Sequence, residues 1–187
     1  MDRTQDMREY LKPYLVKQMQ KKAIEVKKEK NDKLLLSIGT LLEKALKRQE
    51  IQNDWLPAYM GLFHFLTGLV TEDHEYEIMI ADEQLYLDRS KESHIWYPDF
   101  IYFDDGEKEI KKILQSRFYR LNDYEIMYMK RWLFYEYRNL IGVYWKEQIN
   151  EVLKWNEFKS LNKHDTFSFL FGDYMGKTYI VLNYEGV

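Results

Sequence analysis

Two carboxylates and a lysine within residues 98–111 have the types and order that suit metal-assisted hydrolysis. Asp99 comes first, and Glu109 and Lys111 follow with one residue between them. Carboxylate oxygens can hold a divalent cation, and a lysine can activate or orient the attacking water. The chemistry requires Glu109 and Lys111 on a strand that pairs with the strand after Asp99, because side chains two residues apart share one face of a strand. Residues 108–115 instead have the spacing of an amphipathic helix.

The order Pro98-Asp99 followed by Glu109-Ile110-Lys111 resembles the motif of PD-(D/E)xK metal-dependent nucleases. The resemblance covers this segment alone. It implies a nuclease in which Asp99 and Glu109 bind the metal and Lys111 lies beside the attacking water. The chain departs from the family pattern where a helix is predicted in place of the second strand. A nuclease is therefore the third of three functional hypotheses.

The other reactive residue types form no recognisable catalytic or metal-binding motif. The chain has no cysteine, which excludes a disulfide scaffold, a thiolate zinc site and a cysteine nucleophile. It has no Gly-x-Ser-x-Gly sequence and no glycine-rich phosphate loop. His74 and His94 are a conceivable metal pair but lie 20 residues apart, and His64, between two phenylalanines, is predicted to be a core residue. We therefore expect no cofactor and no bound metal.

The most distinctive stretch is 122–159, a basic helical segment that carries ten of the chain's 31 aromatic residues. At about 100° per residue these side chains point to every side of a helix. One face can pack against the chain's own core, and the others must meet further parts of the protein or a partner. The aromatic residues are Tyr124, Tyr128, Trp132, Phe134, Tyr135, Tyr137, Tyr144, Trp145, Trp155 and Phe158.

The net charge of −3 hides a segregated pattern. Residues 1–50 have a balance of +5, residues 71–110 have 3 basic and 13 acidic residues for a balance of −10, and residues 111–160 have +4. These charges either lie on solvated surfaces or form an acidic surface that approaches a basic partner or mimics nucleic acid. Both interpretations stay open.

Helical and alternating patterns predict a mixed chain. The third helix, 55–69, is apolar on nearly all sides and is expected to be the central helix of the core. Asn122 and Glu125 fit a capping box at the start of the long helix, which we expect to bend near Gly142. The predicted elements are helices at 4–30, from 32 and at 55–69, a hairpin of strands 75–80 and 84–88, an edge strand at 95–103, a helix at 107–118, the long helix, and a hairpin of strands 166–171 and 178–184.

The predicted fold class is α+β, mainly helical with two antiparallel β-hairpins. We expect a single domain over 1–187, with an alternative division into 1–90 and 107–187. Two helices followed by a hairpin occur in the predicted order at 32–89 and again at 107–184. That order resembles winged-helix units, which implies a nucleic-acid-associated protein as the second hypothesis.

The first hypothesis is a non-enzymatic protein-binding module, such as an accessory subunit, regulator or inhibitor. Arginine, tryptophan and tyrosine dominate interface hot spots, and the long basic segment is rich in them. The pI of about 5.9 is low for an electrostatic nucleic-acid reader, although a local basic patch could serve. The candidate partner-binding residues are Arg131, Trp132, Tyr135, Arg138, Trp145 and Trp155.

The expected partner is another protein or a second copy of the chain, with nucleic acid contacted directly or through that partner as the alternative. Residues 1–30 are charged throughout and lack a signal-peptide core, and the apolar segment 55–70 is too short to span a bilayer. These features predict a cytoplasmic protein that does not enter a membrane. The usage of lysine, tyrosine and asparagine suggests a bacterial or phage source.

Overall fold

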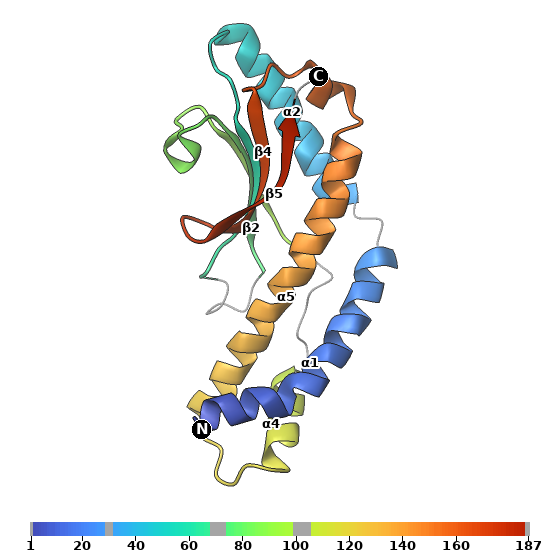
Figure 1. The fold of residues 1–187 in the computed structure, drawn as a ribbon, viewed down its shortest axis with the longest axis vertical. Coiled ribbons are helices and arrows are strands. Elements are labelled where there is room, and N and C mark those ends of the chain that lie inside the picture. The colour runs from blue at the N-terminus through green and yellow to red at the C-terminus, as the bar shows by residue number, and fades with distance from the viewer. Residues whose placement is uncertain (1, 29–31, 68–73, 99–105, 186–187) are drawn as a thin grey trace. The chain divides into compact units, whose positions relative to one another are not determined.

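A computed structural model describes residues 2–28, 32–67, 74–98 and 106–185 (Figure 1). Within these residues the fold is α+β, with five α-helices and one five-stranded mixed sheet. The chain forms two compact units. Unit 1 comprises Met1–Glu29 and Asp99–Ile141, and unit 2 comprises Lys30–Pro98 and Gly142–Val187. Each unit takes segments from both the 1–90 and the 107–187 parts of the chain.

Unit 1 is built from helices α1 (Arg3–Lys28), α4 (Gly106–Gln115) and the first part of α5 (Asp123–Val152). All three were expected from the sequence. Their apolar residues recur every three or four positions, so each helix buries one stripe in a shared core. The buried residues of that core are Met7, Leu11, Leu15, Ile110, Leu114, Met129 and Leu133.

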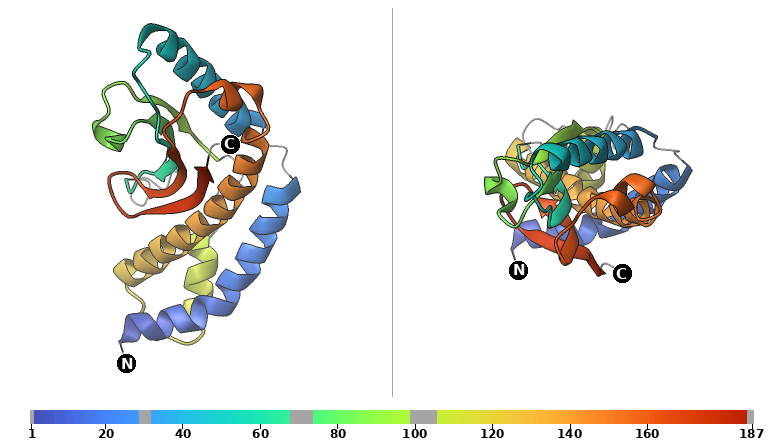
Figure 2. Two further views of the ribbon diagram at one scale, coloured as in Figure 1. Left: turned by 45° about the horizontal axis from the view of Figure 1, so that its top comes forward. Right: turned by 90° about the horizontal axis from the view of Figure 1, so that it is seen from above.

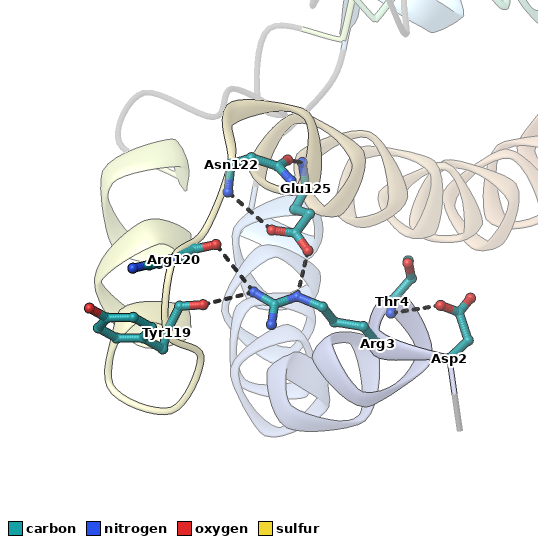
Figure 3. A network of polar contacts seen from close by, with 7 residues as sticks. All are labelled: Asp2, Arg3, Thr4, Tyr119, Arg120, Asn122 and Glu125. Atoms are coloured by element: carbon teal, nitrogen blue, oxygen red, sulfur yellow. Dashed lines mark hydrogen bonds and ion pairs between the residues drawn. The ribbon is translucent and has the colours of Figure 1, made fainter.

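The start of α5 has the capping box that the sequence predicts (Figure 3). The Glu125 backbone N–H donates to Asn122 Oδ1 at 2.8 Å, and the Asn122 backbone N–H donates to Glu125 Oε2 at 3.0 Å. Arg3 Nε donates to the other carboxylate oxygen of Glu125 at 2.6 Å. Arg3 Nη2 also donates to the carbonyl of Tyr119 at 3.0 Å. One arginine therefore ties the first turn of α1 to the loop before α5.

Unit 2 contains the sheet, in the strand order β3-β2-β1-β4-β5. Figure 2 shows the C-terminal strands of this sheet in red. Strand β1 is central, antiparallel to β2 and parallel to β4, and the two outer pairs are antiparallel. The C-terminal hairpin was predicted correctly, since β4 and β5 are joined by a turn at 174–177. The strands are β1 (Tyr59–His64), β2 (Tyr76–Ala81), β3 (Glu92–Trp96), β4 (Thr166–Asp173) and β5 (Thr178–Glu185).

The prediction of a central helix at 55–69 is wrong, because β1 occupies Tyr59–His64. The segment is central, as expected, but in a sheet. A strand that is covered on both faces and paired on both edges is apolar throughout, and such a run cannot be distinguished from a buried helix by its pattern. This strand also changes the order of elements in the described residues of 32–89. The helix-helix-hairpin order that resembles a winged helix is therefore wrong there.

The strand predicted at 84–88 is also wrong. Leu85–Leu87 form a 3₁₀ turn, η1, and β2 pairs instead with β3. Asp88 organises the loop: its carboxylate accepts the backbone N–H of Asp82 at 2.9 Å and that of Ser90 at 2.6 Å. Strand β3 starts and ends earlier than the predicted strand 95–103, and its place at the sheet edge agrees with the expectation from Pro98. Residues 99–103 of that prediction lie outside the described residues.

One face of the sheet is covered by α2 (Asp32–Ile51), α6 (Asn156–Ser160) and residues 142–152 of α5. Arg48 of α2 contacts Glu92, whose sheet partner is Ile80, and Tyr144 of α5 stacks on Trp96 at 6.3 Å. Helix α5 continues through Gly142. The boundary between the two units falls immediately before this residue. Helix α2 buries one apolar stripe, at Leu34, Ile38, Leu41, Leu42 and Ala45.

Candidate functional site

The six candidate partner-binding residues are divided between the two units, four in unit 1 and two in unit 2. Trp145 belongs to the core of unit 2, where its side chain is 0% exposed. Its Nε1 donates to the Leu170 carbonyl at 2.9 Å, and its ring meets Phe169 edge-on at 6.4 Å. A buried tryptophan with its N–H satisfied by the sheet is a packing residue. The assignment of Trp145 to a partner surface is therefore corrected.

Four of the candidates lie on α5 in unit 1. Arg131 is exposed, and Tyr135 is half-buried with the Arg138 guanidinium 4.4 Å from the centre of its ring. Arg138 itself is buried, so this cation–π pair is not a free basic patch. Trp132 is half-buried against the unit 1 core, with the guanidinium of Arg8 5.8 Å from its ring. Only Arg131 of the four is fully open to solvent.

Trp155 lies beside an apolar groove in unit 2. The groove has a volume of about 560 Å³, and its lining residues are Leu35, Leu36, Gly39, Thr40, Glu43, Trp155 and Glu157. The α2 positions follow a helical spacing, so one face of α2 forms a wall. Leu36 is 72% exposed. Gly39 leaves room opposite the tryptophan: a Cβ there would lie 3.7 Å from Trp155 Cζ3. We call this hollow the Trp155 groove.

The junction between α5 and α6 holds Trp155 in place. Trp155 has an extended backbone, with φ −73° and ψ 142°, and precedes the first residue of α6. Helix α6 is anchored by Phe158, which is buried against Phe167 and Phe169. Lys163 Nζ donates to the Phe158 carbonyl at 2.7 Å, and burial lowers the pKa of this lysine. The tryptophan is therefore fixed by a rigid support.

The charged side chains that line the Trp155 groove are acidic. Glu43 comes from α2 and Glu157 from the first turn of α6. Neither carboxylate has an ion-pair partner within the part of the chain that the structure describes. An apolar floor with two available carboxylates suits a ligand that combines apolar and basic groups.

A second hollow, of about 390 Å³, lies at the C-terminal end of α2. Its lining residues are Lys44, Lys47, Arg48, Ile51, Gln52 and Glu92. Arg48 Nε donates to Glu92 Oε1 at 2.9 Å, so these two charges neutralise each other. Lys44 and Lys47 are exposed, and Ile51 is 85% exposed. We call this the Ile51 hollow, and its remaining charge is basic.

Leu36 and Ile51 were missed by the sequence analysis, although a signal was present. Leu34, Leu35 and Leu36 are consecutive, and at about 100° per residue they span about 200° of the helix. A single buried face cannot hold all three. At least one leucine therefore had to face solvent or a partner.

The structure does not provide the geometry of the nuclease motif in its described residues. Glu109 and Lys111 lie on helix α4, not on a strand, and Asp99 lies outside the described residues. Glu109 accepts a hydrogen bond from Tyr14 at 2.7 Å, and burial together with this carboxylate raises the pKa of Tyr14. Glu109 thus contributes to packing between α1 and α4.

Two buried histidines lie at one end of the sheet. The rings of His64 and His74 are 6.1 Å apart, and His64 is a core residue, as predicted. Burial and the neighbouring His64 lower the pKa of His74 to about 3. His94 lies exposed on β3. No cluster of three metal-ligating side chains occurs among the described residues.

Ser160 and Lys163 have the Ser-x-x-Lys spacing of some serine hydrolases, a signal that the sequence analysis missed. Lys163 Nζ donates to the carbonyls of Phe158 and Leu161, at 2.7 and 2.6 Å. These contacts hold the loop after α6 and leave Ser160 without an activating base. Lys163 therefore has a structural role in this loop.

The acidic stretch 71–110 is divided between the two units. In unit 2, Asp88 and Glu77 are buried and Glu92 pairs with Arg48. In unit 1, Glu109 accepts from Tyr14. Many of the described carboxylates in this stretch therefore serve the fold. Glu83 is exposed and lies 3.0 Å from His164 Nε2.

Comparison of the chain with protein-family models, with curated proteins and with solved structures found no match. None of the described helices is both long and apolar enough to cross a bilayer.

Proposed function

We propose that the protein is a non-enzymatic protein-binding module, an accessory subunit, regulator or inhibitor, that takes an amphipathic basic helix of its partner into the Trp155 groove. The observation that supports this proposal is the groove itself. It combines an exposed leucine, a half-exposed tryptophan and two carboxylates on a rigid frame. Its volume lies within the range of ligand-binding clefts, roughly 300–1,000 Å³.

The chemistry of the groove defines the partner. A helix that lies in a groove uses apolar residues spaced by three or four positions. Such residues would cover Leu36 and Trp155, and a lysine or arginine beside them would meet Glu43 and Glu157. The exposed Arg131 and half-exposed Trp132 and Tyr135 on α5 are candidates for a second contact in unit 1.

Affinity capture followed by direct binding tests this proposal. Proteins retained by the wild type are expressed, purified and titrated by calorimetry against wild type, Leu36→Glu and Trp155→Ala. At least one purified partner should bind the wild type and lose about tenfold or more in affinity with each variant. The Leu36→Glu variant matters most, because Leu36 is 72% exposed and its replacement should leave the fold intact.

Leu87→Glu is the matched control. Leu87 is 78% exposed on η1 in the same unit but outside the groove. This variant should bind like the wild type. If every purified candidate binds the groove variants and the control equally well, or if no retained protein binds directly, the proposal is wrong.

A further inference from the structure

Three tyrosines and an arginine form a stripe along the exposed side of α5 in unit 1. Tyr124, Tyr128, Arg131 and Tyr135 are spaced by four, three and four positions, so they fall within an arc of about 60° over about 16 Å of helix. The residues that α5 contributes to the unit 1 core lie on the other side of the helix. Tyr124 is 67% exposed, Arg131 is exposed, and the other two tyrosines are half-buried. We call this surface the Tyr124 stripe.

The rings of the stripe stack on each other and on arginines. Tyr124 and Tyr128 have ring centres 6.5 Å apart and an interplanar angle of 27°. The Arg8 guanidinium of α1 lies 5.0 Å from the centre of the Tyr128 ring, and Arg8 Nη2 donates to the Tyr128 hydroxyl. At the other end of the stripe, the Arg138 guanidinium lies 4.4 Å from the centre of the Tyr135 ring. Rings held in this way lose little conformational freedom when a flat ligand stacks on them.

The carboxylates of this part of α5 lie away from the stripe. Asp123, Glu125 and Glu136 are placed about 90–110° around the helix from its middle. Two of them have partners: Arg3 Nε donates to Glu125 Oε1 at 2.6 Å (Figure 3), and Asn139 Nδ2 donates to Glu136 Oε2 at 3.2 Å. The stripe itself therefore carries no negative charge.

The charge of the stripe is positive and available. Arg131 has no carboxylate partner among the residues that the structure describes. On α1, Glu9 lies 3.6 Å from Lys12. Unit 1 has 16 basic and 13 acidic residues, a balance of +3, whereas the whole chain has −3. This local balance favours an anionic ligand.

Rings that alternate with a cation match the repeating chemistry of a single nucleic-acid strand. Its bases stack on aromatic side chains, and its phosphates accept paired hydrogen bonds from arginine. In a duplex the base faces are already stacked on each other. A protein partner is favoured by a contiguous apolar patch, but here Arg131 separates Tyr128 from Tyr135.

We propose that the Tyr124 stripe binds single-stranded nucleic acid. Bases stack on the three tyrosines, and a phosphate binds Arg131. This site lies in unit 1 and goes beyond the protein-binding function of the Trp155 groove, which lies in unit 2.

Fluorescence anisotropy with labelled dT and rU strands of about 20 nucleotides tests the inference at about 50 and 200 mM salt. The wild type should bind these strands more tightly than a duplex of the same length, and more weakly at the higher salt. Arg131→Gln removes a phosphate contact and should flatten the salt slope by about 0.7, whereas Arg131→Lys should keep the slope. Tyr124→Ala removes a stacked base and no charge, so it should weaken binding about fivefold or more at an unchanged slope.

Lys112→Gln and Tyr179→Ala are the matched controls. Lys112 is an exposed cation of α4, and Tyr179 is a 46% exposed tyrosine of β5, both outside the stripe. Each control should bind the strands like the wild type, with circular dichroism showing that all variants are folded. If no single strand binds at about 50 mM salt, or if the stripe variants and the controls bind equally, the inference is wrong.

The outcome for the Trp155 groove is separate. Leu36→Glu should lose the protein partner and keep the nucleic-acid strand. If no strand binds but Arg131→Gln weakens binding of the purified protein partner, the stripe is a second protein contact, the nucleic-acid inference is wrong and the protein-binding function stands. If the strands bind as expected and no protein does, the nucleic-acid site holds and the proposed function is wrong.

Discussion

Acidification should destabilise unit 2 through His74. This side chain is buried, and its pKa falls from an ordinary value of 6.5 to about 3 because burial and the nearby His64 disfavour the charged form. The unfolded chain therefore binds a proton at a higher pH than the folded chain does. Stability is fully present above pH 6.5 and is lost as the pH falls toward the folded pKa.

The magnitude follows from the difference between the two pKa values. Each unit corresponds to about 1.4 kcal/mol, so at pH 5 the loss is about 2 kcal/mol, and the upper limit near pH 3 is about 5 kcal/mol. A loss of about 2 kcal/mol is a large part of the stability of a typical domain, which is about 5–15 kcal/mol.

Urea unfolding followed by circular dichroism at about pH 5, 6 and 7.5 measures this loss, with hydrogen exchange of β1 and β2 as a local readout. His74→Gln removes the titrating group and should flatten the dependence, whatever its own stability. His94→Gln, at an exposed position on β3, is the control and should keep the wild-type slope. If His74→Gln and the wild type have the same pH dependence, the argument from burial is refuted.

Four further substitutions test the packing and the helix cap. Gly172→Ala should destabilise unit 2 by more than about 2 kcal/mol, because the new Cβ would lie 2.3 Å from the Lys177 carbonyl oxygen. Gly39→Ala should be neutral or stabilising, because the space there is open enough for a methyl group. Thermal unfolding that ranks the two variants otherwise would contradict the packing at Gly172. Asn122→Ala removes one partner of the capping box and should cost about 1 kcal/mol, seen as faster hydrogen exchange in the first turn of α5, and unchanged exchange would show that the cap is not needed. Trp145→Phe leaves the Leu170 carbonyl without its donor and should cost about 1–3 kcal/mol in urea unfolding, with a cost near zero arguing against a packing role.

Features set by neighbouring residues could be predicted from the sequence. The capping box of Asn122 and Glu125 and the helix predicted at 4–30 depend on residues three or four positions apart. The C-terminal hairpin likewise depends on a short turn between two strands. These elements formed where they were expected.

Features set by distant segments could not be predicted from the sequence. Residues 59–64 form a strand because β2 and β4 pair with it on both edges, and no local pattern shows that pairing. In the 84–88 segment an alternating pattern predicts a strand, but the Asp82 carboxylate accepts the Gln84 backbone N–H at 2.7 Å and a 3₁₀ turn follows.

The candidate site residues likewise depend partly on local sequence and partly on packing between distant segments. Residue type alone selected both Trp155, which lines the groove, and Trp145, which is buried because β4, later in the chain, packs against it. The exposure of Leu36 and Ile51 depends on which face of α2 the sheet covers. Local sequence therefore supplied the kind of residue, and tertiary packing decided which of them remained available.

Fluorine NMR of protein labelled with 5-fluorotryptophan measures docking at the groove most directly. Trp155→Phe identifies the Trp155 signal, and the buried Trp145 serves as an internal reference. On addition of a purified partner that binds the wild type, the Trp155 signal should move, the Trp145 signal should stay, and Leu36→Glu should remove the movement of the Trp155 signal. A Trp155 signal that stays in place when the partner binds would contradict docking in the Trp155 groove.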